Sequence, residues 1–320
     1  MQQILLVTFP FFALVLFGWV VTRARLLPLE AIPGLNAFVL FFALPCMLYR
    51  FAASTPIVRL LDPTVSTVYL LCALLMVALA VLTTRRGAVG WNDASFGALV
   101  AAFPNSGFMG VPLLVALLGQ RAAGPAIVAL AIDMVVTSSL CIALSRLDGA
   151  NERGVSGAVG NALKGMLKNP LPWAIVLGCL TAATGFELWL PARNTVGMLA
   201  DGASPVALFT IGAVLARPQK AAATGGTGGG FGDVPLVVFY KLIVHPALVL
   251  GIGKLAQAIG VPLDGFSLTV LVLIAALPSA SSIPMRAERF GADAGRIARI
   301  VLFATAAAFV SVSAAVAWLV

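Results

Sequence analysis

The sequence predicts an all-α polytopic membrane protein with ten transmembrane helices arranged as two inverted five-helix repeats. Three observations support this class: an apolar composition, ten apolar runs of membrane-spanning length, and prolines and glycines that recur in both halves. Of the 320 residues, 61% are hydrophobic and 10% are charged, whereas soluble domains have about 45–50% apolar and about 25% charged residues. So few charges could not cover the surface of a soluble protein of this size. The composition therefore excludes a soluble domain, a disordered chain and a nucleic-acid-binding protein.

An apolar helix of about 20 residues crosses the roughly 30 Å hydrocarbon core of a bilayer. Ten runs of this kind can be placed, and none alternates in polarity as the strands of a membrane barrel do. We number them as spans 1 to 10: 3–22, 34–53, 65–84, 95–119, 124–145, 170–189, 195–216, 234–257, 265–289 and 295–319.

The distribution of lysine and arginine among the loops predicts the orientation. With the N-terminus outside, 14 of the 20 cations fall in cytoplasmic loops, 5 fall in outside loops or nearby helix ends, and Lys241 lies within a span. Positive charges concentrate on the cytoplasmic side of membrane proteins. We therefore predict a protein of the cytoplasmic (inner) membrane with both termini outside, which an even number of spans permits.

Helix-breaking residues recur at nearly constant offsets in the two halves. The matching pairs are Pro10 and Pro170, Gly18 and Gly178, and Pro45 and Pro205, each 160 apart, and Pro104 and Pro278, 174 apart. Each half holds five spans, so the second half must enter the membrane in the opposite direction, as in many transporters. We predict a first repeat over 1–146, a cytoplasmic linker over 147–168 and an inverted second repeat over 169–320. The glycine-rich stretch 224–232 is interpreted as a flexible linker.

Spans 4 and 9 each carry two prolines near mid-membrane, over 103–112 and 277–284. A proline removes a backbone donor and clashes with the preceding turn, and the freed polar groups cannot face lipid. We expect a carboxylate site where these discontinuous helices meet, because half-helix N-termini offer N–H donors and partial positive charge. The alternative is a pair of kinked helices that only pack tightly. The candidate substrate-binding residues are Pro104, Asn105, Ser106, Gly107, Pro112, Pro278, Ser279, Ser281, Ser282 and Pro284.

Three motifs resemble those of the auxin efflux carrier family, whose bacterial members include malonate carriers. Residues 105–112, Asn-Ser-Gly-Phe-Met-Gly-Val-Pro, resemble its Asn-x-Gly-x-x-Gly-x-Pro signature. Tyr240-Lys241-Leu242 with His245-Pro246 is similar to its Lys-Leu-x-x-x-Pro span. The pattern Pro-x-Ala…Ala-x-x-Tyr-Gly of its penultimate helix is matched by Pro278, Ala280, Ala287, Phe290 and Gly291.

The resemblance implies that spans 4 and 9 cross and hold an organic anion. It also implies an elevator-like movement of spans 3–5 and 8–10 against a scaffold of spans 1, 2, 6 and 7, through which we expect a homodimer. Family members often carry an asparagine in the second crossover, where this chain has Ser282.

Ionisable residues inside spans are costly, at roughly 2.5–3.5 kcal/mol on insertion scales, so each needs a role or a partner. Asp133 in span 5, with Thr137 one turn along, is interpreted either as a proton or cation relay or as a structural partner of a broken helix. Asp201 in span 7 is interpreted as a structural or interface residue. Asp133 and Asp201 are thus the acidic candidates at membrane depth.

Three basic residues complete this set. Lys241 and His245 share one face of span 8, and Lys241 either snorkels toward the cytoplasm or acts as a counter-charge for an anion or for Asp133. His245, the only histidine, is interpreted as a hydrogen-bonded structural residue or a pH sensor. Arg286 either marks the cytoplasmic end of span 9 or contacts a second carboxylate of a dicarboxylate.

The predicted function is secondary transport of a small organic anion, most simply malonate or a related carboxylate, with H⁺ or Na⁺ as candidate coupling ions. Alternatives are an exporter of auxin-like aromatic carboxylates, and a channel or carrier of another solute with this fold. An intramembrane aspartyl protease would need a Gly-x-Gly-Asp context that Asp201 lacks. We therefore expect no enzyme activity, no cofactor and no metal site.

Overall fold

The architecture is all-helical throughout the residues that the structure describes. A computed structural model describes residues 2–56, 62–85, 89–147, 170–216 and 232–320, and these ranges form helices, short loops and one isolated β-bridge. The predicted linker over 147–168, apart from Leu147, lies outside the described residues. The same holds for 224–231 of the glycine-rich stretch.

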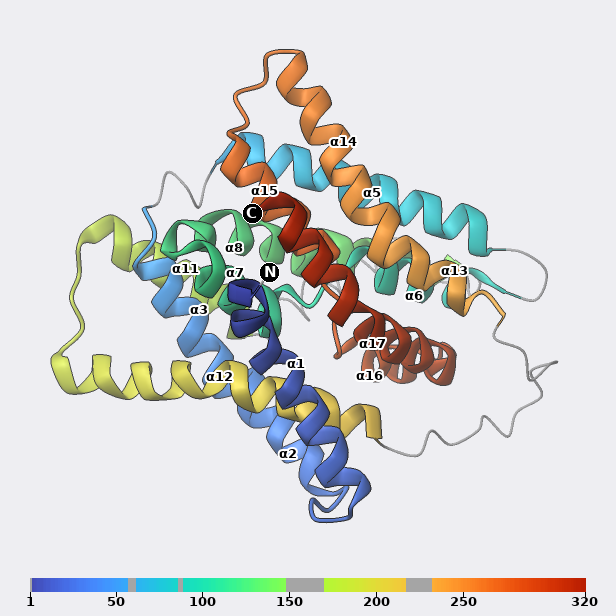
Figure 1. Cartoon of the computed structure of the whole chain (residues 1–320), viewed down its shortest axis with the longest axis horizontal. Coiled ribbons are helices and arrows are strands. Elements are labelled where there is room, and N and C mark those ends of the chain that lie inside the picture. Colours follow the sequence, from blue (N-terminus) through green and yellow to red (C-terminus); the bar gives the residue numbers. More distant parts are fainter. Residues whose placement is uncertain (1, 57–61, 86–88, 148–169, 217–231) are drawn as a thin grey trace. The chain divides into compact units, whose positions relative to one another are not determined.

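A helix occupies each of the ten predicted spans. In chain order the elements of the first half are α1 (Gln2–Arg23), α2 (Ala31–Phe38), η1 (Val39–Ala43), α3 (Leu44–Ala53), α5 (Pro63–Thr84), α6 (Trp91–Ala102), η2 (Ser106–Gly110), α7 (Val111–Leu118), η3 (Gln120–Ala122), α8 (Ala123–Ile132), η4 (Asp133–Thr137) and α9 (Ser138–Leu144). Those of the second half are α11 (Pro170–Thr184), α12 (Leu190–Ala216), α13 (Val234–Phe239), η6 (Tyr240–Val244), α14 (His245–Ala258), α15 (Gly265–Ala276), α16 (Ile283–Arg289) and α17 (Ala294–Leu319) (Figure 1).

Six continuous helices among the described residues are long and apolar enough to cross a membrane. They are Ala31–Ala53, Pro63–Thr84, Gln120–Leu144, Leu190–Ala216, Val234–Ala258 and Ala294–Leu319, and they match spans 2, 3, 5, 7, 8 and 10. The other four predicted spans contain shorter apolar helices: Thr8–Arg23, Ser106–Leu118, Pro170–Thr184 and Gly265–Ala276. Spans 4 and 9 fall short of the required length because their prolines divide each into two half-helices.

Within the described ranges, four π-helical segments adjoin the α-helices, and prolines account for three of them. Pro45, Pro112 and Pro246 each lie two residues after the end of a segment, η1, η2 and η6 respectively. The pyrrolidine ring removes one hydrogen bond and clashes with the preceding turn, which widens to relieve the clash. No proline follows η4, which begins at Asp133. That segment therefore needs another cause, and π segments are frequent at functional sites.

The helices group into two compact units, each described by itself. Unit 1 comprises Met1–Pro63, Ser106–Ala131 and Leu167–Arg217, and so contains spans 1, 2, 6 and 7 with the adjoining halves of spans 4 and 5. Unit 2 comprises Thr64–Asn105, Ile132–Met166 and Pro218–Val320, and so contains spans 3, 8, 9 and 10 with the remaining halves of spans 4 and 5. The chain passes between the units at the break of span 4 and directly before η4.

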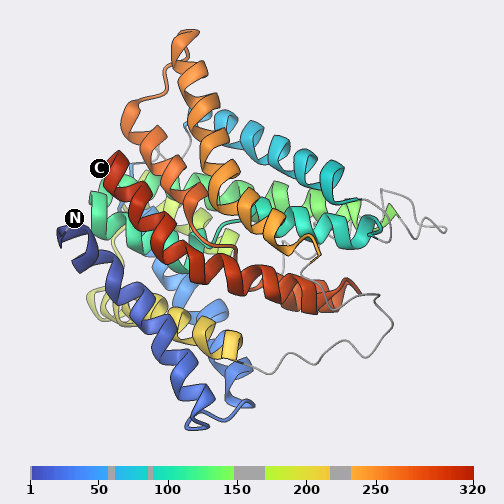
Figure 2. The same cartoon turned by 45° about the vertical axis from the view of Figure 1, so that its right-hand side comes forward.

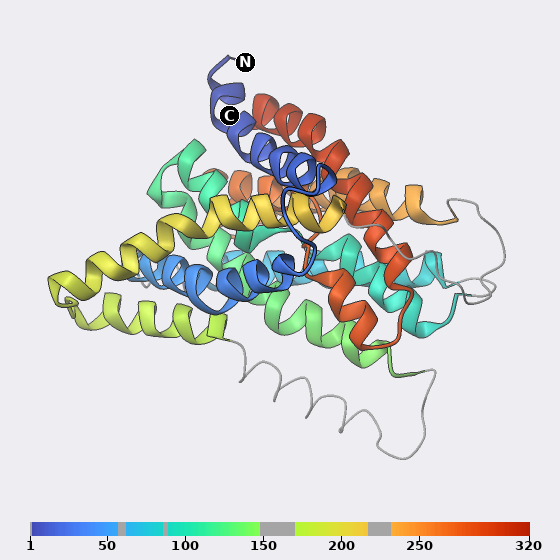
Figure 3. The ribbon, with the colours of Figure 1, turned by 90° about the horizontal axis from the view of Figure 1, so that it is seen from below.

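Close backbone approach at two of the repeated glycines holds unit 1 together. A Cβ added at Gly18 of α1 would lie 1.9 Å from the Phe209 carbonyl oxygen of α12, and Figure 3 shows α1 in dark blue beside the gold end of α12. At Gly178 of α11 an added Cβ would lie 2.7 Å from the Tyr49 carbonyl oxygen of α3. Any larger residue would separate these helices. Span 1 thus packs on span 7, and span 6 packs on span 2.

The two half-helices that precede the breaks lie in the core of unit 2. Every residue of α6 from Ala94 to Ala102 is buried, and so is every residue of α15 from Val270 to Ala276. A helix that is apolar on all sides belongs in the interior of a bundle. Helix α14 and α15 form an antiparallel hairpin, visible in orange in Figure 2, in which an added Cβ at Gly253 would lie 2.2 Å from Leu268 Cδ1.

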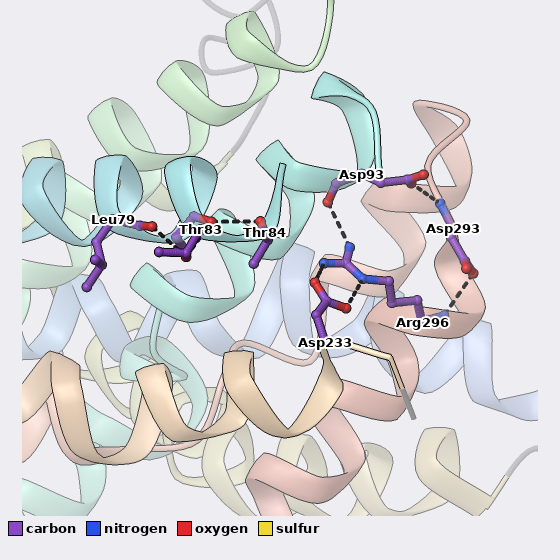
Figure 4. A network of polar contacts seen from close by, with 8 residues as sticks. Leu79, Thr83, Thr84, Asp93, Asp233, Asp293 and Arg296 are labelled. Atoms are coloured by element: carbon purple, nitrogen blue, oxygen red, sulfur yellow. Dashed lines mark hydrogen bonds and ion pairs between the residues drawn. The ribbon is translucent and has the colours of Figure 1, made fainter. Parts of the chain in front are cut away.

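A nearly enclosed arginine joins three helix N-termini at one end of unit 2 (Figure 4). Arg296 of α17 is 7% exposed, and its guanidinium donates to both carboxylate oxygens of Asp233, at 2.8 and 2.5 Å, and to the Asp93 carbonyl oxygen at 2.8 Å. The Asp293 side chain accepts from the Arg296 N–H, and the Asp93 side chain accepts from the Asp293 N–H. The network therefore fixes the start of α6 against the starts of α13 and α17.

We predict that Arg296→Gln lowers the free energy of unfolding by about 3 kcal/mol, because it leaves the Asp233 carboxylate without its counter-charge. The matched control is Arg299→Gln, since Arg299 is an exposed arginine one turn further along α17. Thermal unfolding of the purified protein in detergent measures both. Equal melting temperatures for the two variants would contradict a stabilising role for the network.

Candidate functional site

The breaks of spans 4 and 9 cross within unit 2 and satisfy each other's backbone. Pro104 and Ser279 form an antiparallel bridge in which the Asn105 N–H donates to the Pro278 carbonyl oxygen at 2.8 Å. The Ala280 N–H donates to the Phe103 carbonyl oxygen at 3.1 Å. The crossing implied by the family resemblance is thus observed. These two hydrogen bonds replace part of what the helices lose at their prolines.

Most of the predicted substrate-binding residues lie beside this crossing. Ser279 is buried, and its hydroxyl donates to the Val100 carbonyl oxygen of α6 at 2.8 Å. This hydrogen bond stabilises the crossing. Asn105 is 5% exposed, while Ser281 and Ser282 are half-buried. The predicted residues of unit 2 are Pro104, Asn105, Pro278, Ser279, Ser281, Ser282 and Pro284, and those of unit 1 are Ser106, Gly107 and Pro112.

A fully buried carboxylate lies in the same unit as the crossing. Asp133, at 0% exposure, accepts a hydrogen bond from the Tyr69 hydroxyl at 2.8 Å and another from the Thr137 hydroxyl at 3.1 Å. Thr137 is the partner that the i, i+4 spacing indicates. Tyr69 was missed by the sequence analysis, although a tyrosine inside an apolar span signals a buried hydroxyl that needs a partner. The side-chain contacts of Asp133 coincide with the one π segment that no proline explains.

Lys241 and His245 form a second polar pair, and both are completely buried. The Lys241 ammonium donates to the Ala275 carbonyl oxygen at 2.9 Å and lies 3.1 Å from His245 Nδ1. Ala275 is in the last turn of α15, so the ammonium stabilises the negative end of this half-helix directly before the break. Of the two interpretations of Lys241, the snorkelling one is contradicted, because the side chain is completely buried and donates to the α15 carbonyl.

The two polar pairs interact with each other. The charges of Asp133 and Lys241 attract across the interior of unit 2, and the Tyr69 and His245 rings lie 6.3 Å apart. An ammonium has no lone pair, so beside a charged Lys241 the His245 Nδ1 atom must accept, which assigns the ring proton to Nε2. That buried Nε2 atom has no hydrogen-bond partner among the described residues. Only one ring nitrogen of His245 therefore has a hydrogen-bond partner among the described residues, whereas a purely structural histidine would be expected to use both.

The remaining ionisable candidates have different partners. Asp201 pairs with Arg50 at 2.7 Å within unit 1, in an ion pair whose side chains are largely exposed. Such pairs contribute little to stability in water, but at membrane depth each charge gains a counter-charge. Arg286 donates to the Ser138 hydroxyl at 2.7 Å and lies against the Phe103 ring in unit 2.

We predict that Lys241→Met lowers the free energy of unfolding by about 2–3 kcal/mol, since Asp133 then lacks a nearby positive charge. In the double variant with Asp133→Asn the loss should be smaller than the sum of the two single losses, because the residues interact. Lys254→Met, at an exposed lysine of the same helix, is the control. Thermal unfolding of all variants measures the coupling, and strictly additive effects would contradict it.

Comparison of the sequence with known proteins shows the family of this chain. The sequence model of the family described as "Membrane transport protein" matches residues 4–316. The chain is 27% identical over 311 residues to a "Putative malonate transporter" of Rhizobium meliloti (strain 1021), covering 95% of this chain and 92% of the relative. It is 24% identical over 307 residues to an "Uncharacterized transporter" of Methanothermobacter thermautotrophicus, covering 93% and 92% of the two chains.

A plant protein is also similar along most of the sequence. "Auxin efflux carrier component 8" of Arabidopsis thaliana is 23% identical over 323 aligned positions, covering 85% of each chain. The family predicted from residues 105–112, 240–246 and 278–291 is thereby confirmed. The apolar helices and the family match together show an integral membrane protein. The chain therefore belongs to the membrane transport protein family, which includes the auxin efflux carriers that its motifs resemble.

Proposed function

We propose that this protein is a secondary transporter that moves a small organic anion across the cytoplasmic membrane by alternating access. Malonate or a related carboxylate is the proposed substrate. The single observation that carries the proposal is the pairing of two broken helices at Pro104 and Ser279, with small polar side chains beside both breaks. Discontinuous helices that meet in this way form substrate sites in many transporters.

The chemistry beside the breaks suits a carboxylate. Asn105 offers amide donors on one strand of the crossing, and Ser281 and Ser282 offer hydroxyl donors on the other. Each break also costs backbone hydrogen bonds in a medium without water. Helices that only pack tightly do not need such breaks, so the breaks favour a binding site. Similarity over 95% of this chain to a protein whose printed name is "Putative malonate transporter" supports a small carboxylate as the substrate.

An inverted repeat and an elevator-like movement belong to the same proposal. The glycines of spans 1 and 6 support the repeat, because each packs against the second span of the opposite half. The grouping of spans 1, 2, 6 and 7 in one unit supports a scaffold of these spans, and the grouping of spans 3, 8, 9 and 10 supports a separate moving part. We further propose outside termini and a homodimer through the scaffold helices.

Uptake of radiolabelled malonate into proteoliposomes tests the substrate. We expect saturable uptake that is accelerated by unlabelled malonate inside the vesicles, since a carrier shows trans-stimulation and a pore does not. Asn105→Ala should lower Vmax/KM about 10-fold or more through loss of a hydrogen bond to a charged group. The control is Asn194→Ala, at an exposed asparagine of α12.

Other outcomes would contradict the substrate or the mechanism. Uptake of indole-3-acetate without uptake of malonate would favour the auxin-like alternative. Flux that neither saturates nor responds to trans substrate would favour a channel. Equal activity of Asn105→Ala and Asn194→Ala would contradict a role of the crossing in substrate binding.

We also propose that the polar group of Asp133, Lys241 and His245 couples transport to H⁺ or Na⁺. A completely buried carboxylate can bind H⁺ or Na⁺ on one side of the membrane and release it on the other. When the cation neutralises Asp133, the remaining charge of Lys241 would be offset by the organic anion that binds in the same step. The unpartnered His245 Nε2 adds a further polar atom to the same interior. Coupling would then be local to unit 2.

In Asp133→Asn we expect exchange of internal for external substrate to continue, while accumulation driven by an ion gradient is lost. Substrate uptake under an imposed pH gradient and under an imposed Na⁺ gradient measures this, and also identifies the ion. Asp201→Asn, at the other intramembrane aspartate, is the control. Gradient-driven accumulation by Asp133→Asn at the wild-type level would exclude Asp133 from coupling.

A further inference from the structure

Arg286 is a cation of the crossing region that has no carboxylate partner among the described residues. The ion pairs of the described residues are Arg50 with Asp201 in unit 1 and Arg296 with Asp233 in unit 2. Arg286 donates instead to the neutral Ser138 hydroxyl at 2.7 Å, and its Cζ lies 5.8 Å from the centre of the Phe103 ring. Neither contact neutralises its charge.

Two other cations inside unit 2 have an acidic partner. Arg296 contacts both oxygens of Asp233, and Asp133 attracts the charge of Lys241. Asp133 interacts electrostatically with Lys241, whereas the contacts of Arg286 are the neutral Ser138 and Phe103. The surplus positive charge is on Arg286, and an uncompensated cation inside a membrane span is costly unless it binds an anion.

Position and direction place this charge at the edge of the crossing. Arg286 lies one turn after Ser282, whose carbonyl oxygen accepts its N–H at 3.4 Å. Side chains in a helix lean toward the N-terminus, which directs the Arg286 side chain back toward the break. The Phe103 ring that it contacts belongs to the residue directly before Pro104. The guanidinium thus lies beside both breaks.

The corresponding position in the other broken helix carries no charge. The offset of 174 that relates Pro104 to Pro278 relates Arg286 to Pro112. Of the two positions that this offset relates, 286 carries a cation and 112 does not. A substrate with a carboxylate at each end would find a different partner at each, which fixes its orientation.

We propose that Arg286 binds the second carboxylate of a short dicarboxylate and makes the site selective for dicarboxylates over monocarboxylates. The inference rests on the proposed function, in which the first carboxylate binds beside Asn105, Ser281 and Ser282. The guanidinium presents paired N–H donors that match a carboxylate. Ser138 and the Phe103 ring hold the guanidinium in place, so little rotamer freedom is lost on binding.

The test compares malonate with its monomethyl ester, which keeps one carboxylate and nearly the same size. In proteoliposomes, Arg286→Gln should raise KM for malonate about 10-fold or more and leave KM for the half-ester near the wild-type value. Arg286→Lys should be intermediate, because lysine keeps the charge but loses the planar fork. Arg289→Gln, at an exposed arginine of the same helix, should match the wild type for both compounds.

Thermal stabilisation of the purified variants by each compound gives an independent readout of binding. Malonate should raise the melting temperature of the wild type and of Arg289→Gln, but not that of Arg286→Gln. The inference is wrong, while the proposed function stands, if Arg286→Gln and wild type have the same KM for malonate. It is also wrong if Arg286→Gln weakens the binding of malonate and of the half-ester equally. If the wild type neither binds nor transports a carboxylate, the proposed function itself fails.

Discussion

The mutual hydrogen bonding of two broken helices is the constraint on which the rest of this structure depends. Inside a bilayer no water is available to an unpaired N–H or C=O group, so a helix can be interrupted only where another part of the protein replaces the lost bonds. Here Asn105 and Ala280 donate across the crossing to Pro278 and Phe103. The half-helices α6 and α15 must then lie in the core of unit 2, where most of their residues are buried.

Charged groups around this crossing follow from the same constraint. The Lys241 ammonium reaches the last turn of α15 and stabilises its free carbonyl end, which also brings it toward Asp133. Asp133 in turn is held by Tyr69 and Thr137, where its helix widens into a π segment. At the far end of α6, Arg296 fixes the start of the same half-helix through Asp93. Each half-helix of the core is thus anchored by a basic side chain from another span.

Local patterns predicted an all-helical membrane protein, the two breaks and most of the buried polar residues. Hydropathy and proline act within one segment, so the break at Pro104 could be predicted from nearby residues. The π segments before Pro45 and Pro246 were not predicted, but the same prolines explain them. The reading of Lys241 as a snorkelling residue was wrong because side-chain length alone does not show which carbonyl it reaches. Tyr69 was overlooked because its partner is 64 residues away.

By itself, the sequence determined that this protein is helical, lies in a membrane, and breaks spans 4 and 9 at paired prolines. It also determined the family, since the motifs around 105–112 and 278–291 are local. Only the tertiary structure decided which break residues bond to each other, which buried charges attract each other, and that Arg286 has no carboxylate partner in the part of the chain that the structure describes. The physical reason is that these partners are far apart in the chain, from 64 residues for Tyr69 and Asp133 to 203 for Asp93 and Arg296. Such pairings depend on how helices pack, and no periodicity within a single span encodes them.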